Sequence, residues 1–191
     1  ERNTTDNILN PTRGTIATFS LEPSFKALGS DVNYIKSTLG LSGYKKLFNV
    51  VFASRILVGV IEPFGVTGTF DIPIFKRFFA GGPTSVRGFP FQRLGPLDKS
   101  GDPIGGNSLL EGSFETRFPI YKDFGGVVFF DYGNVYSKAF DYKLSELKYS
   151  PGVGLRYNTL IGPIRADVGY ALNPEPGIRR IQFWFGIGQA F

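Results

Sequence analysis

The residues that could do chemistry in this chain are its carboxylates and arginines, because cysteine and histidine are both absent. Their absence excludes disulfides, thiolate nucleophiles, zinc sites built on Cys or His, and catalytic pairs in which histidine activates serine or cysteine. Two carboxylates, Glu111 and Glu115, share one face of an expected strand. Nothing in the sequence indicates a cleft around them, so a structural role is favoured over the paired-acid chemistry of a glycosidase.

Nucleotide and nucleic-acid sites are not predicted either. The stretch GVGLRY (residues 152–157) has the first two glycines of a dinucleotide fingerprint but not the third, and it is expected to lie in a strand. The net charge is +5, yet lysine and arginine are scattered and form no run longer than two. We therefore predict a protein that is not an enzyme, needs no cofactor or metal ion, and has no nucleic-acid partner.

One arginine stands out because of its neighbours. The stretch GGPTSVRGFPF (residues 81–91) places Arg87 among glycines and phenylalanines. It lies within the longest part of the chain that lacks strand-like alternation, a loop expected at about residues 65–107. The side chains that Arg87 contacts therefore depend on the strands that flank this loop.

Alternation of apolar and polar residues with a period of two recurs on both sides of the loop. In SLLEGSFETRFPI, for example, Leu110, Phe114 and Phe118 oppose Glu111 and Glu115. The pattern predicts an all-β chain of eight antiparallel strands, at roughly residues 13–24, 33–45, 50–61, 108–120, 125–136, 151–158, 163–172 and 180–191.

The connections between these strands alternate in length. Short turns are expected near residues 43–49, 121–125 and 161–163, and longer loops near residues 25–32, 64–107, 137–148 and 173–179. Short turns on one rim and long loops on the other are typical of transmembrane barrels of the outer membrane, with the short turns in the periplasm. An even number of strands then places both chain termini on the periplasmic side.

A soluble β-sandwich or a lipocalin-like barrel would also show short alternating strands. The face opposite the apolar one favours the transmembrane barrel, because it combines glycines with charged residues of both signs, such as Glu115, Arg117, Asp131 and Asp167. A small polar interior needs such paired charges. No apolar run approaches the roughly 18 residues of a spanning helix, which excludes a helical membrane protein.

The segment FFAGGPTSVRGFPFQRLGP (residues 78–96) resembles the sixth-loop segment of the BamA/TamA family of outer-membrane assembly and translocation barrels. The family hallmark V-R-G-F is matched by residues 86–89, and the GGN at residues 105–107 also fits. SFETRFP, FFDYGNVY, GPIRADVGYAL and QFWFGIGQAF resemble the strands that follow this loop in the family. The resemblance covers roughly residues 8–191.

The resemblance implies a role for each residue of the hallmark. In the family the loop folds back into the barrel lumen and its arginine bonds acids on the inner wall, which correspond here to Glu115 and Asp131. An arginine in a poorly hydrated lumen needs such fixed acceptors, and a planar guanidinium can engage two carboxylates at once. Gly88 would let the backbone bend or approach the wall, and Phe89 would pack the loop tip.

The end of the chain resembles the terminal assembly signal of bacterial outer-membrane proteins. The matching residues are Phe191, an aromatic last residue, and Gly186, a glycine five positions earlier. Gln189 departs from the pattern, because an apolar residue is usual at that position.

Family members have a sixteen-stranded barrel preceded by periplasmic POTRA domains, and this chain matches the final eight strands, with no POTRA domain among its residues. Residues 1–191 are therefore expected to be the C-terminal part of a barrel in the bacterial outer membrane. Three architectures stay open: part of a larger barrel, an eight-stranded barrel closed on itself, or two chains that pair. An eight-stranded barrel has room only for side chains, so self-closure would push the long loop outward.

The resemblance implies a factor that helps to assemble, insert or translocate other outer-membrane proteins. Its partners would be outer-membrane lipids and nascent outer-membrane proteins, with POTRA-bound periplasmic partners or a second copy of the chain as further candidates. The alternative function is a secretion pore, or the barrel anchor of a passenger enzyme, in the same superfamily.

Overall fold

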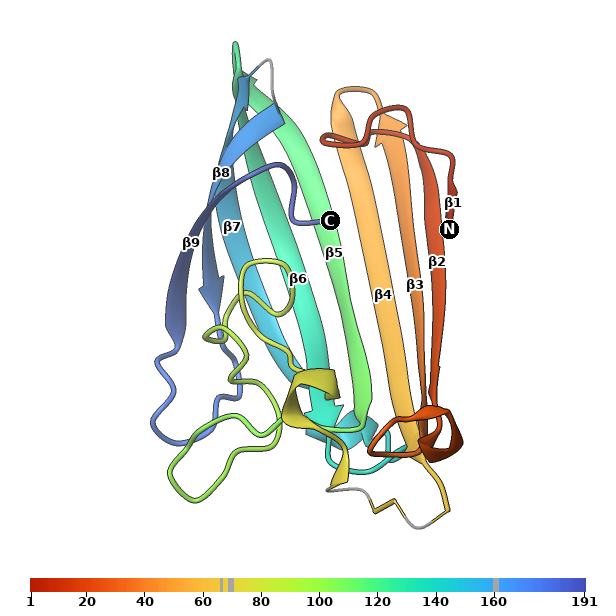
Figure 1. Ribbon diagram of the computed structural model, residues 1–191. Coiled ribbons are helices and arrows are strands. Elements are labelled where there is room, and N and C mark those ends of the chain that lie inside the picture. Colours follow the sequence, from red (N-terminus) through yellow and green to blue (C-terminus); the bar gives the residue numbers. More distant parts are fainter. Residues whose placement is uncertain (66, 69–70, 160–161) are drawn as a thin grey trace.

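The computed structural model describes residues 1–65, 67–68, 71–159 and 162–191 of the chain (Figure 1). They form one antiparallel sheet in which each strand pairs with its neighbours in chain order. The strands are β1 (Arg2–Asn3), β2 (Gly14–Ser24), β3 (Tyr34–Leu47), β4 (Val50–Pro63), β5 (Ser108–Tyr121), β6 (Phe124–Tyr136), β7 (Lys148–Thr159), β8 (Gly162–Tyr170) and β9 (Ile181–Ile187). The short 3-10 helices found among the described residues of the loops are η1 (Lys26–Leu28), η3 (Ile74–Lys76) and η4 (Leu144–Glu146).

The all-β prediction is confirmed, and all eight expected strands are present. The count of eight is wrong by one, because the two-residue β1 precedes them and pairs with β2 through Arg2 opposite Ala17. No signal in the sequence marks this strand, since two residues are too few to show a period.

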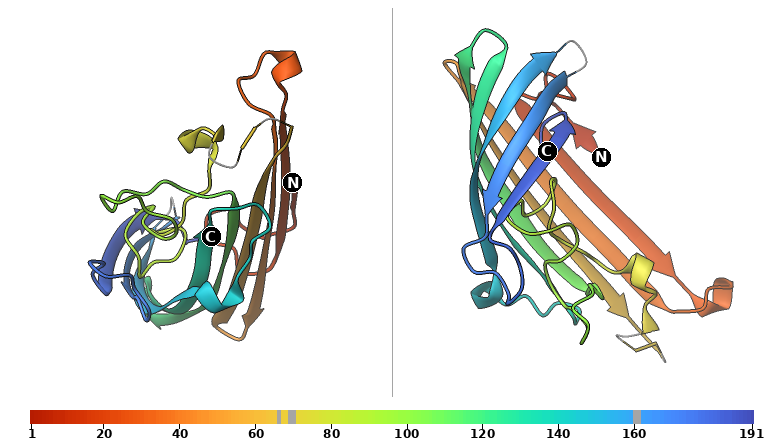
Figure 2. Two further views of the ribbon diagram at one scale, coloured as in Figure 1. Left: turned by 90° about the horizontal axis from the view of Figure 1, so that it is seen from below. Right: turned by 90° about the vertical axis from the view of Figure 1, so that its left-hand side faces the viewer.

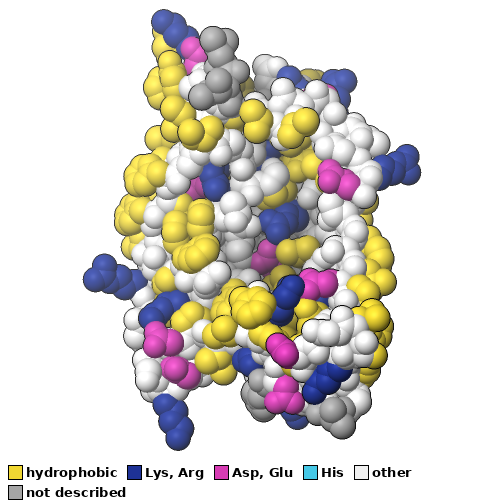
Figure 3. All heavy atoms as spheres, in the orientation of Figure 1, with side chains coloured by type: hydrophobic (Ala, Val, Ile, Leu, Met, Phe, Trp, Pro, Cys, Tyr) yellow, Lys and Arg dark blue, Asp and Glu magenta, His cyan; other side chains and the backbone are white. Residues whose placement is uncertain are grey.

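Strand alternation separates an apolar outer face from a polar inner face. Side chains such as Phe183 and Val153 are exposed on the outside, whereas Glu115, Asp131 and Arg156 are buried on the inside. In the space-filling view, Asp and Glu side chains and part of the Lys and Arg side chains lie in the hollow, other Lys and Arg side chains project from the outer edges, and hydrophobic side chains line both flanks (Figure 3). This division is the one expected for a barrel wall that meets lipid outside and a polar lumen inside.

The sheet curves around the long loop but stays open. Among the described residues, β9 pairs only with β8, and the opposite edge is formed by β1 and β2. The loop between β4 and β5 (residues 64–107, here called the lid) fills the concave side of the sheet (Figures 1 and 2). This arrangement argues against a self-closed eight-stranded barrel, whose interior would have no room for the lid.

The two rims of the sheet differ as expected from the connection lengths. Residues 48–49 connect β3 to β4 and residues 122–123 connect β5 to β6, both on the upper rim of Figure 1. The third expected short turn falls partly on residues 160–161, which lie outside the described residues. The lid and the loops after β2, β6 and β8 lie on the opposite rim.

The prediction that residues 180–191 form one strand is wrong. Strand β9 ends at Ile187, and Gly188 takes a left-handed conformation (φ 86°) while its N–H donates to Pro163 O (2.7 Å). The chain then turns into the hollow, where Ala190 is buried and the ring of Phe191 lies 6.3 Å from that of Tyr44. Phe191 therefore lies on the inside, and not on the outer face with Phe183 and Phe185.

The hydrophobic core lies between the lid and the inner face of the sheet. It joins lid residues Ile72, Phe78, Val86, Phe89 and Leu94 to wall residues on β3 to β6 and to Ala171, just after β8. The lid is therefore packed as part of the folded body and is not a solvated loop.

No helix among the described residues is long and apolar enough to cross a membrane.

Candidate functional site: the lid and its buried arginine

The tip of the lid is closed by its own backbone. Gly82 N–H donates to Phe89 O (3.1 Å), and Leu94 N–H donates to Ala80 O (3.0 Å). Gly81 and Gly82 have φ angles of 94° and 113°, which other residues adopt only with strain. The tight path that these bonds and glycines impose places Arg87 against the sheet.

The side chain of Arg87 is 1% exposed and is held by acids from two neighbouring strands. Its Nε and NH2 donate to the two carboxylate oxygens of Asp131 at 2.8 and 2.7 Å, and its NH1 donates to Glu115 Oε1 at 2.6 Å. The backbone N–H of Arg87 also donates to Asp131 Oδ2 (3.0 Å), and NH2 donates to Ser113 Oγ (3.2 Å). The planar guanidinium thus makes a bidentate contact with one acid and a single contact with another, a geometry that lysine could not reproduce.

The wall beneath Arg87 is set by the register of β5 and β6. Ser113 lies opposite Asp131, and Glu115 lies opposite Phe129, so alternate residues of the two strands converge on one patch of the inner face. Ser113 Oγ donates to Asp131 Oδ1 (2.5 Å), and the guanidinium carbon of Arg87 lies 3.4 Å from the centre of the Phe129 ring. Ser113 therefore helps to hold the Asp131 carboxylate in place, and the Phe129 ring adds a cation–π contact to Arg87.

The structure also places the other hallmark residues. A Cβ on Gly88 would lie 2.5 Å from Ser150 Oγ and 2.8 Å from the backbone N of Ala171, so only glycine lets the lid approach the wall this closely. Phe89 is fully buried in the core between the lid and the sheet.

Three glycines on the inner face of β7 and β8, Gly152, Gly154 and Gly169, make room for different groups. A Cβ on Gly169 would meet the lid backbone, 2.6 Å from Arg87 C and O. A Cβ on Gly152 would instead clash with the Phe129 ring, and a Cβ on Gly154 would clash with Asp167. Gly152 and Gly154 therefore make room for side chains of neighbouring strands. Of the three, Gly169 is therefore the one that makes room for the lid itself.

Contacts to the lid from other strands could not be assigned from the sequence. Arg55 on β4 donates to Thr84 O (2.7 Å) and to Glu111 Oε1 (2.8 Å), and Glu111 also accepts a hydrogen bond from Ser85 Oγ. Alternation fixes the face of the sheet on which Arg55 and Glu111 lie, but it gives no information on which loop atoms they contact. Glu111 and Glu115 thus share a face, as predicted, and both bind arginine.

Strands β8 and β9 also bind the lid backbone. Arg165 NH1 donates to Pro83 O (2.9 Å), and the indole N–H of Trp184 donates to Arg87 O (2.7 Å). Trp184 is the only tryptophan in the chain, and it lies on the edge strand β9. The lid therefore connects the middle of the sheet to its last strand.

A second ionic cluster anchors the start of the lid. Lys76 Nζ lies 2.6 Å from Glu22 Oε1, which also accepts from Tyr34 OH (2.7 Å), and Lys36 Nζ donates to Lys76 O (2.7 Å). Lys36 also lies over the Phe78 ring. The side chains of Lys76 and Glu22 are 36% and 42% exposed, so this pair contributes far less than the buried pairs of Arg87.

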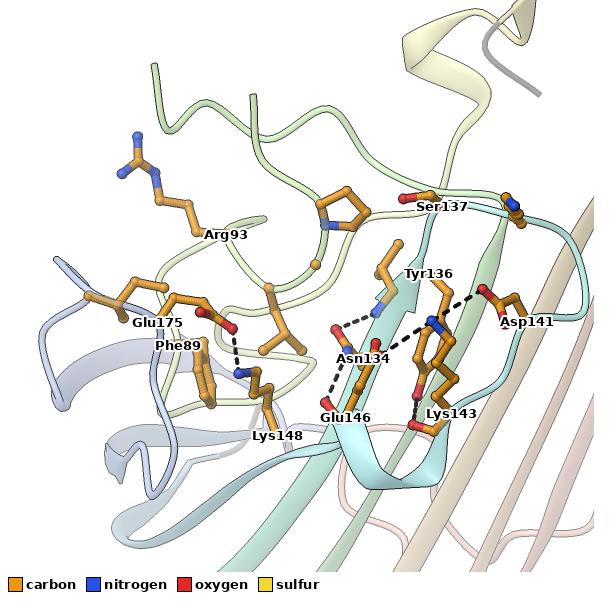
Figure 4. Close-up of a pocket in the computed structure, with 16 residues that line it drawn as sticks. Phe89, Arg93, Asn134, Tyr136, Ser137, Asp141, Lys143, Glu146, Lys148 and Glu175 are labelled. Atoms are coloured by element: carbon orange, nitrogen blue, oxygen red, sulfur yellow. Dashed lines mark hydrogen bonds and ion pairs between the residues drawn. The ribbon is translucent and has the colours of Figure 1, made fainter. Parts of the chain in front are cut away.

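A cavity of about 450 Å³ lies beside the lid on the long-loop rim (Figure 4). Phe89 and Arg93 of the lid, the end of β6 and the loops after β6 and β8 form its walls. Opposite charges are paired around it: Lys148 Nζ lies 2.5 Å from Glu175 Oε1, and Lys143 Nζ lies 3.3 Å from Glu146 Oε1. The first pair joins the loop after β8 to the start of β7, and the second lies within the loop after β6.

The arrangement around Arg87 is suited to holding a loop and not to bond chemistry. All three guanidinium nitrogens of Arg87 donate to fixed acceptors, and both acids that it binds are fully buried. Within the described parts of the chain, no group of three or more acidic side chains could hold a metal ion.

A mutant cycle tests whether Arg87, Glu115 and Asp131 act as a unit. In a protein that already carries Arg87→Ala, adding Glu115→Gln and Asp131→Asn is expected to lower stability little further, because the partner that the two acids share is already gone. The measurement is the temperature at which the folded form disappears in semi-native electrophoresis. If the stability losses of the separate substitutions simply add, the three residues do not act as a unit. Glu175→Gln, in an exposed pair, is the control and should have the same small effect in both backgrounds.

Comparisons with known proteins agree with the curved sheet and its lid. The chain is 32% identical to the outer membrane protein assembly factor BamA of Nitratidesulfovibrio vulgaris over 197 residues (100% of this chain, 24% of the relative), and 31% identical to BamA of Neisseria meningitidis serogroup B over 223 residues (97% and 27%). It thus spans about a quarter of the length of these curated relatives.

The crystal structure of BamA from Haemophilus ducreyi lacking POTRA domains 1–3 matches with a TM-score of 0.78 and 25% identity, over 95% of this chain and 40% of that one. The family model described as the Omp85 superfamily domain matches residues 1–191. The chain therefore belongs to the Omp85 superfamily.

Proposed function

We propose that this chain is the C-terminal part of the barrel of an outer-membrane protein assembly factor, and that Arg87 locks the lid inside that barrel. The observation that carries the proposal is the fully buried Arg87, bonded to Asp131 and Glu115 on an open, curved sheet of the Omp85 superfamily. The relatives that are named as outer membrane protein assembly factors support the activity.

The open edges of the sheet support a larger assembly. Among the described residues β9 has no partner besides β8, and unpaired backbone groups are too costly to leave in a lipid bilayer. We propose that further strands complete the barrel, supplied either by the remainder of a sixteen-stranded barrel or by a second copy of the chain. The apolar outer face would then contact outer-membrane lipids.

The lengths of the connections on the two rims support one orientation of the sheet in the outer membrane. Short turns face the periplasm in outer-membrane barrels, and both the start of β2 and the end of β9 lie at the short-turn rim. We therefore place both chain termini on the periplasmic side of the bacterial outer membrane, from which nascent outer-membrane proteins would approach. Gly186 lies next to the side chain of Arg165. The role of Gly186 and Phe191 as an assembly signal stays a prediction.

Reconstitution tests the activity. The full-length protein that contains this chain is inserted into liposomes, an unfolded outer-membrane barrel is added, and its folding is followed by its shift in semi-native electrophoresis. Folding is expected to be faster than in empty liposomes, and slower with Arg87→Ala than with the wild type. Equal rates with and without the protein would refute an assembly role. Release of one dedicated passenger, without any effect on other barrels, would favour a secretion pore or a barrel anchor.

A further inference from the structure

A second cavity lies at the opposite end of the hollow from the one in Figure 4. Its volume is about 370 Å³, and it lies at the short-turn rim, beside the ends of β3 and β7. Its charged lining residues are Lys46, Arg117 and Arg156, and none of the described residues that line it is acidic. The cavity beside the lid differs, because acids there balance the lysines.

One of these cations has a free donor. Arg156 is 3% exposed; its Nε donates to Gln189 Oε1 (3.0 Å) and its NH1 to Asp167 Oδ1 (2.6 Å). The third nitrogen, NH2, is buried and has no hydrogen-bond partner within the described part of the chain. Buried donors of a charged group are rarely left unpaired in folded proteins, so this atom points to an acceptor that the described residues do not supply.

Two acids of the inner wall, Asp167 and Glu115, are each shared among more than one arginine. Asp167 lies 2.6 Å from Arg156, 3.3 Å from Arg165 and 3.7 Å from Arg87. Glu115 is divided between Arg87 and Arg117 in the same way. This region therefore has more positive than negative charge in a poorly hydrated interior, where an additional anion is attracted strongly.

Polar side chains from both ends of the chain enclose the same cavity. Gln189, which departs from the usual apolar residue near the end of the chain, donates through Nε2 to Asn10 Oδ1 (2.9 Å) and binds Arg156 through Oε1. The loop that presents Asn10 is folded by Asp6, whose carboxylate accepts from Thr12 Oγ1 (2.5 Å) and from the backbone N–H of Thr12 (2.8 Å). These hydrogen bonds to the ionised carboxylate lower the pKa of Asp6 to about 2.

We propose that the cavity at the short-turn rim binds an oxyanion, either a carboxylate or a phosphate group, between Lys46, Arg117 and Arg156. The free NH2 of Arg156 supplies a buried donor, Lys46 supplies an exposed charge, and the side-chain amides supply neutral donors. Because Asn10 and Gln189 join the two ends of the chain at this cavity, a bound anion would also strengthen that junction.

Lys46 and its neighbour Lys45 allow a matched test. Both are exposed on β3, but successive residues of a strand point to opposite faces, and only Lys46 lines this cavity. The purified protein in detergent at constant ionic strength is titrated calorimetrically with inorganic phosphate, with a short peptide that has a free terminal carboxylate, and with the same peptide amidated. We expect saturable binding of phosphate, of the free-acid peptide, or of both, and none of the amidated peptide.

Lys46→Gln is expected to weaken that binding about fivefold, since it removes one charge contact from a partly hydrated site. Lys45→Gln makes the same change in net charge on the outer face and should leave the affinity unchanged. Because both residues are exposed, neither variant should alter the thermal unfolding of the protein. Binding of phosphate alone would identify a free anion as the ligand, and binding of the free-acid peptide alone would identify a terminal carboxylate.

Two results would overturn the proposal. The first is no saturable binding of either anionic probe to the wild type. The second is equal weakening by Lys46→Gln and Lys45→Gln, since the attraction would then arise from overall charge and not from the cavity. Arg156→Gln is the complementary variant and should abolish binding if it retains the unfolding temperature of the wild type.

Discussion

The variant Arg87→Ala is expected to release the lid from the sheet and to lower the temperature at which the folded protein unfolds in semi-native electrophoresis. The substitution removes every side-chain contact of Arg87 and leaves Asp131 and Glu115 buried beside each other without this cation. Removing one partner of a buried ion pair typically costs about 3 to 5 kcal/mol. The free energy of lid docking should fall by a similar amount.

Trp184 provides a direct measurement of this release. It is the only tryptophan and its indole N–H donates to Arg87 O, so its fluorescence should shift to longer wavelength when the lid leaves and water enters. Limited proteolysis should also begin to cut within residues 78–107. Unchanged fluorescence, protease resistance and unfolding temperature would contradict the lock.

Two further variants separate the geometry of Arg87 from its charge. Arg87→Lys keeps the positive charge but cannot make the bidentate contact with Asp131 together with the contact to Glu115, so it should resemble Arg87→Ala more than the wild type. Arg93→Ala removes an arginine from the same lid whose pair with Asp102 is largely exposed, and it should change nothing measurable.

The second large effect is expected for Gly169→Ala on β8. The added Cβ would lie 2.6 Å from Arg87 C and O and 2.7 Å from Gly88 N. These are backbone atoms of the lid tip and cannot turn aside as a flexible side chain would. The lid must shift, which stretches the contacts of Arg87, and overpacking of this kind typically costs about 1 to 3 kcal/mol.

The measurement for Gly169→Ala is again the unfolding temperature together with Trp184 fluorescence. Gly43→Ala on β3 is the matched control, because its Cβ would meet only Ser54 Oγ at 3.7 Å. We expect a lower unfolding temperature and a fluorescence shift for the first variant and neither for the second. If both variants behave like the wild type, close packing of the lid tip on β8 is not needed for docking.

The sequence by itself determined which residues form the long strands and on which face of the sheet each of their side chains lies. Alternation with a period of two predicted all eight long strands and placed Glu111, Glu115 and Asp131 on the inner face. It succeeded because lipid outside and a polar lumen inside impose opposite requirements on successive residues of a strand. The prediction failed at residues 188–191, where the left-handed Gly188 ends the alternation without a signal in the pattern.

Only the tertiary structure decided which distant groups meet. The lid backbone accepts hydrogen bonds from Arg55, Arg165 and Trp184, which come from three different strands. Gly152 and Gly154 make room for Phe129 and Asp167, and not for the lid. The physical reason is that alternation fixes the face on which a side chain lies, whereas its partner depends on the curvature of the sheet and on the path of the lid across it.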